Sequence, residues 1–350
     1  MKQLSNFNEK KRLAVLFGGR SAEHEISIIT ALQAITAIDP LRYEIIPVYV
    51  TLEGKWFTGT GLLDKSIYRQ FSQKTNGLQE VTLLPDPSIQ GLVPIEHGCV
   101  HLDKKIPTDL FLLQFHGQQG EDGCIQGLLE LADIAYTGCG VLSSAVAMNK
   151  FHCKAFLREK GIPSLPAVTV SHEELLRDGL EVVEQKILAT PGLENFPLFV
   201  KPNTLGSSIG ISKVEDSVSL HAALLKGFRY DRTLIIEPCV VDLMEINVSV
   251  LGDQASVVEI PVATDGILTY EDKYMRGGKK TGTQGMASLL RVIDPQDLNE
   301  EIKAFVMNYA LNAYAALECL GVSRFDFILD KSNGRLFFNE LNPLPGSNAF

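Results

Sequence analysis

The first third of the chain alternates short apolar runs with amphipathic stretches. Its expected strands are residues 13–17, 43–50 and 110–115, and its expected helices are residues 21–38 and 127–132. Ser21 is the expected N-cap of the first helix, since serine often caps a first turn. Strands that alternate with helices are typical of parallel sheets. The pattern therefore predicts a Rossmann-like α/β domain over residues 1–149, whose strand ends face a ligand.

The pattern changes at Asn149, where a lysine-rich helical stretch (NKFHCKAFLREKG) begins and then ends at Gly161. Residues 197–214 are two strand-like runs joined by a small polar loop with glycine, which predicts a hairpin with a long flexible tip. Such a tip can fold over a ligand. We place a second domain at residues 150–234, built around this hairpin.

Strand patterns dominate the remaining residues, 235–350, which form the third expected domain. The expected strands are residues 234–237, 245–251, 256–260, 324–329 and 336–342, and residues 281–288 are an expected loop. The last two strands flank a turn at residues 330–334 (DKSNG) that is rich in residues tolerating positive φ. They are therefore expected to form an antiparallel hairpin. The predicted fold class is α/β, with an α+β arrangement in the later domains.

Composition narrows the class of protein. A chain of 350 residues suits two or three domains, and 45% hydrophobic with 21% charged residues is ordinary for a folded globular protein. The formal net charge of -10 argues against a general nucleic-acid binder, because clustered Lys and Arg hold phosphate backbones. The six cysteines have no C-x-x-C spacing, so we expect reduced thiols and no zinc.

No targeting or membrane segment is evident in the sequence. The first twelve residues are polar, and no apolar run approaches the roughly 18 residues needed to span a bilayer. The expected location is the cytoplasm, with no membrane partner.

The closing hairpin carries the most informative pattern. Asp326 lies on its first strand, while Glu340 and Asn342, two residues apart, share a face of the second. Carboxylate and amide oxygens suit Mg²⁺, which proteins hold together with substrate phosphates. The alternative is a solvated hairpin face. Four phenylalanines surround these residues, however, and acids among apolar residues usually have a partner.

Cationic residues lie near both hairpins. Lys201 ends one strand, and Ser207 and Ser208 follow in the glycine-containing tip, a combination of ammonium and free backbone amides that suits phosphate. A flexible hairpin without a ligand is the alternative. Arg324 shares the side of Asp326 and either holds an oxyanion beside the metal or forms an Arg–Asp surface pair.

Two glycine-rich turns in the first domain offer further candidates. Glu23 follows Gly18-Gly19 and either holds the ammonium of an amino acid or complements a helix dipole. His116 is the first residue of the turn sequence HGQQGEDG (116–123) and either pairs with a ligand or satisfies the turn. P-loop, dinucleotide and G-x-S-x-G signatures do not occur, so P-loop NTPases, classical dinucleotide enzymes and α/β hydrolases are not supported.

Seven motifs taken together resemble the D-alanine–D-alanine ligase family of ATP-grasp enzymes, in order and in spacing. They are GGRSAEHEIS (18–27), HGQQGEDGCIQGLLEL (116–131), YTGCGVLSSAVAMNK (136–150), FVKPNTLGSSIGISKV (199–214), YEDKY (270–274), RFDFIL (324–329) and NELNPLPG (339–346). The resemblance implies an N-terminal α/β domain followed by two ATP-grasp subdomains, with ATP between these two. It also implies Mg²⁺ or Mn²⁺, with two ions, and a homodimer.

The implied reaction joins two D-alanines for peptidoglycan precursor synthesis. The carboxylate of the first attacks the γ-phosphate of ATP to give an acyl phosphate and ADP, and the amine of the second then displaces phosphate.

The resemblance also assigns roles to individual residues. It implies phosphate or nucleotide contacts for Lys150, Lys201, Ser208, Glu237 (adenine) and Glu245 (ribose), and metal ligation for Asp326, Glu340 and Asn342. It implies catalytic roles for Glu23, Ser207, Tyr274 and Arg324, and substrate contacts for Glu23, His116, Arg324 and Gly346. The spacing of Glu237 and Glu245 differs by one residue from the family pattern. Tyr274 resembles the dipeptide-forming rather than the depsipeptide-forming members.

Two departures from the family leave alternatives open. The loop after Tyr274 lacks the aromatic and Cys-Pro-Ala features of many members, and the chain stops at Phe350, where relatives continue. The first departure favours a ligase for another amino or hydroxy acid. The second favours a truncated paralogue that binds nucleotide without turnover.

Overall fold

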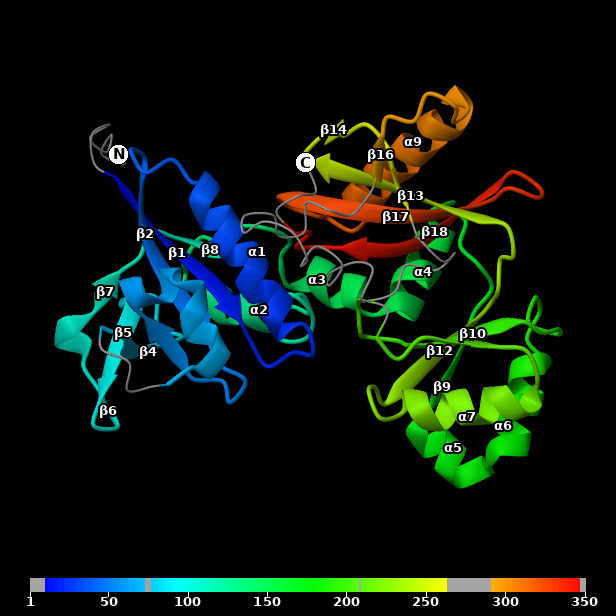
Figure 1. Ribbon diagram of the computed structural model, residues 1–350, viewed down its shortest axis with the longest axis horizontal. Helices are drawn as coiled ribbons and strands as arrows, with labels where there is room; N and C mark the ends of the chain where they lie inside the picture. The colour runs from blue at the N-terminus through cyan, green and yellow to red at the C-terminus, as the bar shows by residue number, and fades with distance from the viewer. Residues whose placement is uncertain (1–9, 73–76, 208, 263–290, 347–350) are drawn as a thin grey trace. The chain divides into compact units, whose positions relative to one another are not determined.

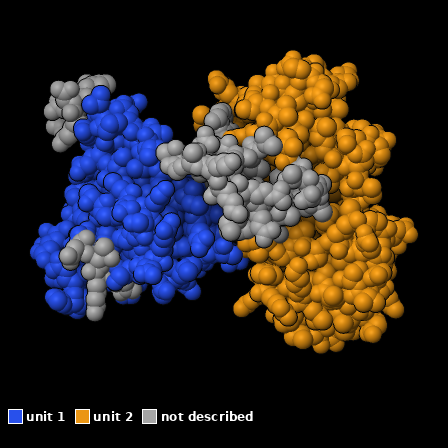
Figure 2. Space-filling model, viewed as in Figure 1, with its two compact units in different colours: residues 1–141 blue, residues 142–350 orange. Residues whose placement is uncertain are grey.

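The computed structural model describes residues 10–72, 77–207, 209–262 and 291–346. The chain divides into two compact units, residues 1–141 and residues 142–350 (Figure 2). The first unit thus ends before the predicted boundary at residue 149. The separation of residues 150–234 from residues 235–350 stays a prediction.

The first unit is built on a mixed sheet with strand order β6-β5-β4-β3-β2-β1-β8, in which β7 lies beside β5. Its strands are β1 (Lys11–Gly18), β2 (Tyr43–Val50), β3 (Trp56–Thr58), β4 (Gln79–Leu83), β5 (Gly91–Glu96), β6 (Cys99–Val100), β7 (Ile106–Pro107) and β8 (Leu110–Leu113). Strand β1 pairs in parallel with β2 and with β8, which confirms the predicted parallel strands. Strands β3 to β7 extend the sheet in antiparallel fashion, which the sequence pattern did not predict.

Helices of the first unit connect these strands. They are α1 (His24–Ala37), α2 (Cys124–Leu131), and the short 3-10 helices η1 (Thr60–Leu63), η2 (Lys65–Gln70) and η3 (Leu102–Lys104). Helix α1 contacts β1, and Val15 and Phe17 of that strand share a buried cluster with Ile28 and Ala31 of the helix (Figure 1). Strand β1 therefore pairs with β2 on one side and β8 on the other, and α1 packs against it.

The expected N-cap of α1 is wrong. The helix begins at His24, with Glu23 in the N-cap position. The hydroxyl of Ser21 accepts the backbone N–H of Glu23 at 3.0 Å, so Ser21 closes the turn before the helix. Ser21 thus uses its hydroxyl in this local turn and does not cap the helix.

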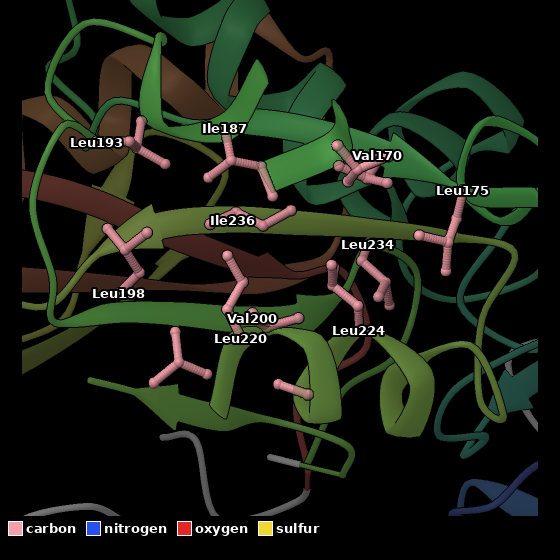
Figure 3. Close-up of a cluster of buried hydrophobic side chains, with 13 residues drawn as sticks. Val170, Leu175, Ile187, Leu193, Leu198, Val200, Leu220, Leu224, Leu234 and Ile236 are labelled. Atoms are coloured by element: carbon pink, nitrogen blue, oxygen red, sulfur yellow. The ribbon is translucent and has the colours of Figure 1, made fainter. Parts of the chain in front are cut away.

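The second unit contains an antiparallel sheet with strand order β11-β10-β12-β9. Its strands are β9 (Val168–Ser171), β10 (Leu198–Pro202), β11 (Ser212–Val214) and β12 (Thr233–Pro238). Pairing of β10 with β11 confirms the predicted hairpin. Helices α5 (His172–Asp178), α6 (Leu180–Leu188) and α7 (Ser217–Gly227) contribute to its core, which includes Ile187, Leu220 and Ile236 (Figure 3).

A further antiparallel sheet of this unit has the order β16-β15-β13-β17-β18, with β14 beside β13. Its strands are β13 (Leu243–Leu251), β14 (Gln254–Ala255), β15 (Glu259–Pro261), β16 (Arg291–Ile293), β17 (Val322–Asp330) and β18 (Arg335–Asn342). Helix α9 (Glu300–Ala316) contacts β13 and β17 along one face (Figure 1). Among the described residues, the remaining α-helices are α3 (Val141–Met148) and α4 (Lys150–Glu159), and α4 contacts β18.

The expected strand at residues 256–260 is interrupted. Ser256 separates β14 from β15, because its hydroxyl accepts the N–H of Ser249 at 3.0 Å and donates to the carbonyl of Val257 at 2.7 Å. The backbone N–H of Ser256 still donates to the carbonyl of Ser249 at 2.8 Å, but the N–H of Ser249 is diverted to a side chain. Pairing resumes where Glu259 lies opposite Asn247.

The predicted closing hairpin is confirmed, with an irregularity that the pattern did not reveal. Asp330 pairs with Arg335 near the turn, whereas Asp326 pairs with Glu340, so the register shifts by one residue between Phe327 and Asp326. A β-bulge accommodates the extra residue in β18. Within the described residues, no helix is long and apolar enough to cross a membrane.

The apolar core around β12 allows a prediction about the free energy of unfolding. Ile236 is fully buried, so we expect Ile236→Ala to lower the free energy of unfolding of the second unit by about 2–5 kcal/mol, through lost apolar burial and the cavity left behind. Urea unfolding followed by circular dichroism measures it. Leu176→Ala on α5, 73% exposed, is the control and should change stability by less than about 0.5 kcal/mol. Equal losses in both variants would contradict the described core.

Candidate active site

One face of the sheet formed by β13, β17 and β18 carries buried apolar residues such as Val248 and Phe325, whereas the other face carries a group of polar residues. Directly paired residues project to the same side of a sheet, so cross-strand pairing arranges the polar face in two rows. The first row is Asn247, Asp326 and Glu340, and the second row is Ser249, Arg324 and Asn342. The structure thus brings four of the candidate residues together, and adds Asn247 and Ser249, which the sequence analysis missed.

Arg324 and Asp326 form a bidentate pair within the polar face. Nε of Arg324 donates to Oδ1 of Asp326 at 2.7 Å, and its terminal nitrogen donates to Oδ2 at 2.8 Å. The amide nitrogen of Asn342 also donates to Oδ2, at 3.1 Å, which directs its amide oxygen away from the carboxylate. Because both guanidinium bonds lie in one plane, the arginine is held in a fixed orientation.

Helix α4 places Lys150 beside Glu340. Its Nζ lies 3.4 Å from Oε2 of Glu340 and donates to the carbonyl of Leu205 at 2.8 Å. Asn149 caps this helix by accepting the N–H of His152, and the backbone of Asn203 accepts the N–H of Lys150. The first turn of α4 is therefore attached to the end of β10 and reaches β18.

One turn further along α4, Lys154 is buried and forms an ion pair with Glu237 of β12. The second oxygen of Glu237 accepts a hydrogen bond from Lys201 of β10 at 2.7 Å. Both oxygens of this glutamate, which the resemblance linked to adenine, thus have ammonium partners in the described structure. Lys154 escaped the sequence analysis, although its spacing of four from Lys150 puts both on one helix face.

These contacts shift the pKa values of the partners. Burial raises the pKa of Glu237, but the charges and hydrogen bonds of Lys154 and Lys201 outweigh this effect and lower the pKa to about 2. Burial lowers the pKa of Lys201, and the carboxylates of Glu237, Glu340 and Glu245 outweigh it, so the pKa lies above its ordinary value. Lys201 is therefore charged at neutral pH.

Other candidates of the second unit lie near these strands or outside the described residues. Glu245 of β13 lies two residues before Asn247 and so shares its face. Ser207 lies in the tip between β10 and β11 with a positive φ of 54°, and Gly346 follows β18. Ser208 and Tyr274, together with the expected loop at residues 281–288, lie outside the described residues.

Glu23 and His116 belong to the first unit. Glu23 is 4% exposed and lies against the turn that follows β8, since a Cβ added at Gly117 would be 2.6 Å from its Oε2. Gly117 has φ of +79°, so glycine suits this position both sterically and conformationally. Nε2 of His116 is 3.1 Å from the hydroxyl of Thr30. The two glycine-rich motifs thus meet at the carboxyl ends of β1 and β8.

Two further residues, His24 and Ser27, hold the ends of β1 and β8 together with the first turn of α1, and the sequence analysis did not identify them. Nδ1 of His24 donates to the carbonyl of Gly19 at 2.6 Å, and Nε2 accepts from the hydroxyl of Tyr49 at 2.9 Å. The hydroxyl of Ser27 accepts the N–H of Gly18 and donates to the carbonyl of Gln114. The motif GGRSAEHEIS contains both His24 and Ser27. The positions of these two residues in the expected helix do not show from the sequence alone that their side chains are buried.

The donor set of the polar face suits a hard divalent cation. Its two carboxylates and amide oxygens are the ligand types that Mg²⁺ and Mn²⁺ prefer, and a carboxylate retains lone pairs when it also accepts from arginine or lysine. Among the described residues, no group of three or more His, Cys, Asp and Glu side chains is arranged to hold a metal ion. Amide oxygens, water or phosphate must therefore complete any coordination shell here.

Comparison with known families agrees with this arrangement. A model described as "D-ala D-ala ligase N-terminus" matches residues 12–139, and one described as "D-ala D-ala ligase C-terminus" matches residues 156–350. The chain is similar to the D-alanine–D-alanine ligases of Heliobacterium modesticaldum, with 36% identity over 96% of this chain and 87% of that one, and of a Thermoanaerobacter strain, with 38% identity over 97% and 89%.

Solved structures of ligases are also similar to this chain. VanG D-Ala:D-Ser ligase from Enterococcus faecalis superimposes with a TM-score of 0.77 and 30% identity, over 97% of this chain and 91% of that chain. The D-alanine–D-alanine ligase from Coxiella burnetii has a TM-score of 0.77 and 29% identity, over 97% and 86%. The fold is therefore the ATP-grasp fold, and the protein is an enzyme of the ligase class. The chain belongs to the D-alanine–D-alanine ligase family.

The pair of lysines around Glu237 makes stability depend on pH in acid. The pKa of Glu237 is about 2 in the folded protein against an ordinary 4.5, so its contribution to stability is complete above about pH 5 and is lost as the pH falls toward 2. Lys154→Met removes one ammonium and raises this pKa. We expect urea unfolding between about pH 2 and pH 5 to show a flatter pH dependence in this variant.

The control for this experiment is Lys226→Met, which removes an exposed lysine on α7. It should leave the acid dependence of the wild-type protein unchanged. An unaltered acid dependence in Lys154→Met would show that Glu237 does not owe its low pKa to Lys154.

Proposed function

We propose that this enzyme joins two D-alanines to D-alanyl-D-alanine, releases ADP and phosphate, and supplies a precursor of peptidoglycan. The observation that carries the proposal is the pair of polar rows on β13, β17 and β18, with Lys150 and Lys201 beside them. Such a surface offers positive charge for phosphates and oxygen ligands for a cation. Membership of the family supports the substrate.

The chain's own residues have separate tasks in this reaction. Lys150 and Lys201 bind phosphate oxygens of ATP and neutralise their charge. Asp326, Glu340 and Asn342 would hold Mg²⁺ or Mn²⁺, which when bound would supply positive charge for the transferred phosphoryl group. The two-step course through an acyl phosphate divides amide formation into phosphoryl transfer and acyl transfer, in which phosphate is the leaving group.

Arg324 stabilises negative charge beside the metal. Its bidentate bond to Asp326 fixes the guanidinium plane, so its remaining N–H groups are oriented before the reaction begins. A donor that does not have to reorganise lowers the energy of an oxyanion more than a mobile one. Glu23 of the first unit binds the ammonium of the first D-alanine, and its burial supports this role.

A second acceptor deserves a parallel test, because one structural relative is a D-Ala:D-Ser ligase. Residues 263–290, which contain Tyr274 and the unusual loop, lie outside the described residues. The choice between D-alanine and another acceptor therefore rests on product analysis. The identity of the ion as Mg²⁺ or Mn²⁺, the number of ions, the homodimer and the cytoplasmic location stay predictions.

The direct test incubates the protein with ATP, Mg²⁺ and D-alanine. We expect one phosphate and one ADP for each D-alanyl-D-alanine, measured by a coupled ADP assay and by chromatography of the dipeptide. Parallel reactions contain D-serine or D-lactate with D-alanine. ATP turnover that yields only a mixed product would replace the proposed acceptor, and binding of ATP without any turnover would reject the proposed function.

Removal of one charged ligand tests the metal site. Glu340→Gln keeps the size of the side chain but removes its charge, so we expect kcat/KM to fall by on the order of 100-fold or more. The loss should shrink at high Mg²⁺ if it reflects weaker metal binding. Glu181→Gln, an exposed position on α6, is the matched control and should keep wild-type activity. Wild-type activity in Glu340→Gln would contradict the ligand assignment.

A further inference from the structure

Asn247 occupies the centre of the polar face without an assigned role. It lies directly opposite Asp326 in the pairing of β13 with β17, and Asp326 lies directly opposite Glu340. Side chains of directly paired residues share one face, with Cβ atoms about 4.5–5.5 Å apart. Asn247 therefore extends the row of Asp326 and Glu340 by one strand.

The side chain of Asn247 is buried and incompletely bonded. The residue is 7% exposed, and its Oδ1 has no hydrogen-bond partner among the described residues. An amide oxygen buried in this way destabilises the folded protein relative to a hydrogen-bonded one. A branched apolar residue would pack on this strand without that cost, as Val248 and Val250 do on the opposite face.

The neighbours of Asn247 restrict what its oxygen can accept. Asp326 offers only acceptor oxygens when ionised, and these already receive Arg324 and Asn342. Positive charge already lies at both carboxylates, since Arg324 donates to Asp326 and Nζ of Lys150 is 3.4 Å from Oε2 of Glu340, whereas no described donor reaches Oδ1 of Asn247. A divalent cation, with its bound waters, is the group that satisfies all three at once.

We propose that Asn247 supplies an additional oxygen to the coordination shell of the divalent cation held by Asp326, Glu340 and Asn342. The inference rests on the proposed function, since it takes these three residues as metal ligands. An additional neutral oxygen raises the affinity for the ion without adding charge repulsion between ligands. It also explains a polar residue at a position that packing alone would fill with an apolar one.

Binding of Mn²⁺ measured by electron paramagnetic resonance tests this role without turnover. The full chain is titrated with Mn²⁺ in the presence of ADP, and free Mn²⁺ is read from its signal. We expect Asn247→Leu to weaken Mn²⁺ binding by about 10-fold or more, and Asn247→Asp, which keeps an oxygen at this position, to retain it. Asn312→Leu, at an exposed position on α9, is the matched control and should bind as the wild type does.

Two measurements separate metal ligation from a structural role. Thermal unfolding in EDTA should show no loss of stability in Asn247→Leu, because leucine removes an unpaired polar atom. Affinity for ADP in EDTA should also be unchanged. Unfolding at lower temperature with wild-type Mn²⁺ affinity, or an equal loss of ADP affinity without metal, would overturn the inference.

The same titration distinguishes failure of the inference from failure of the proposed function. If Glu340→Gln weakens Mn²⁺ binding but Asn247→Leu does not, Asn247 is no ligand and the metal site stands. If neither variant weakens it, the metal site and the inference both fall. If Asn247→Leu does not fold, Asn247→Ser replaces it in the titration, because the shorter serine side chain moves the oxygen away from the cation. Wild-type Mn²⁺ affinity in Asn247→Ser would overturn the inference.

Discussion

The register of the closing hairpin determines on which face of the sheet the candidate site lies. Near its turn, β17 and β18 pair as Asp330 with Arg335, and the same register continued would put Asn339 opposite Asp326. Glu340 and Asn342 would then project to the opposite face, among apolar side chains such as Val248 and Phe325. The bulge in β18 advances the strand by one residue and turns both to the polar face. The contacts that Glu340 and Asn342 contribute to the two polar rows depend on this single insertion.

Helix α4 joins the two sheets of the second unit through its charged side chains. Lys154 reaches β12, and Lys150, one turn earlier, reaches β18. Buried ion pairs add little net stability compared with well-packed apolar residues, because both partners lose their hydration. Their value here is positional, since a buried lysine that leaves its carboxylate would lose several kcal/mol. The pairs therefore fix Lys150 and Lys154 relative to the two sheets.

Sequence patterns predicted the elements of this fold better than their details. The parallel strands around β1, the β10–β11 hairpin and the closing hairpin followed from period and turn residues. The antiparallel strands β3 to β7 did not, because short strands carry few alternating positions. The alternation of Glu245, Asn247 and Ser249 on β13 would have revealed Asn247, whereas Lys154 required knowledge of the buried glutamate on a distant strand. The bulge leaves no mark in the hydrophobic pattern, since its residue is neither glycine nor proline.

In the proposed function, the pair of Lys150 and Glu340 links the binding of phosphate to that of the metal ion. Each residue already neutralises the other at 3.4 Å. A phosphate that draws Lys150 away exposes the charge of Glu340, and a cation that occupies Glu340 frees the ammonium for phosphate. Ion exchange of this kind makes each ligand strengthen the other by the same factor, because thermodynamic coupling between two sites is reciprocal. A metal–nucleotide complex is then preferred over either component alone.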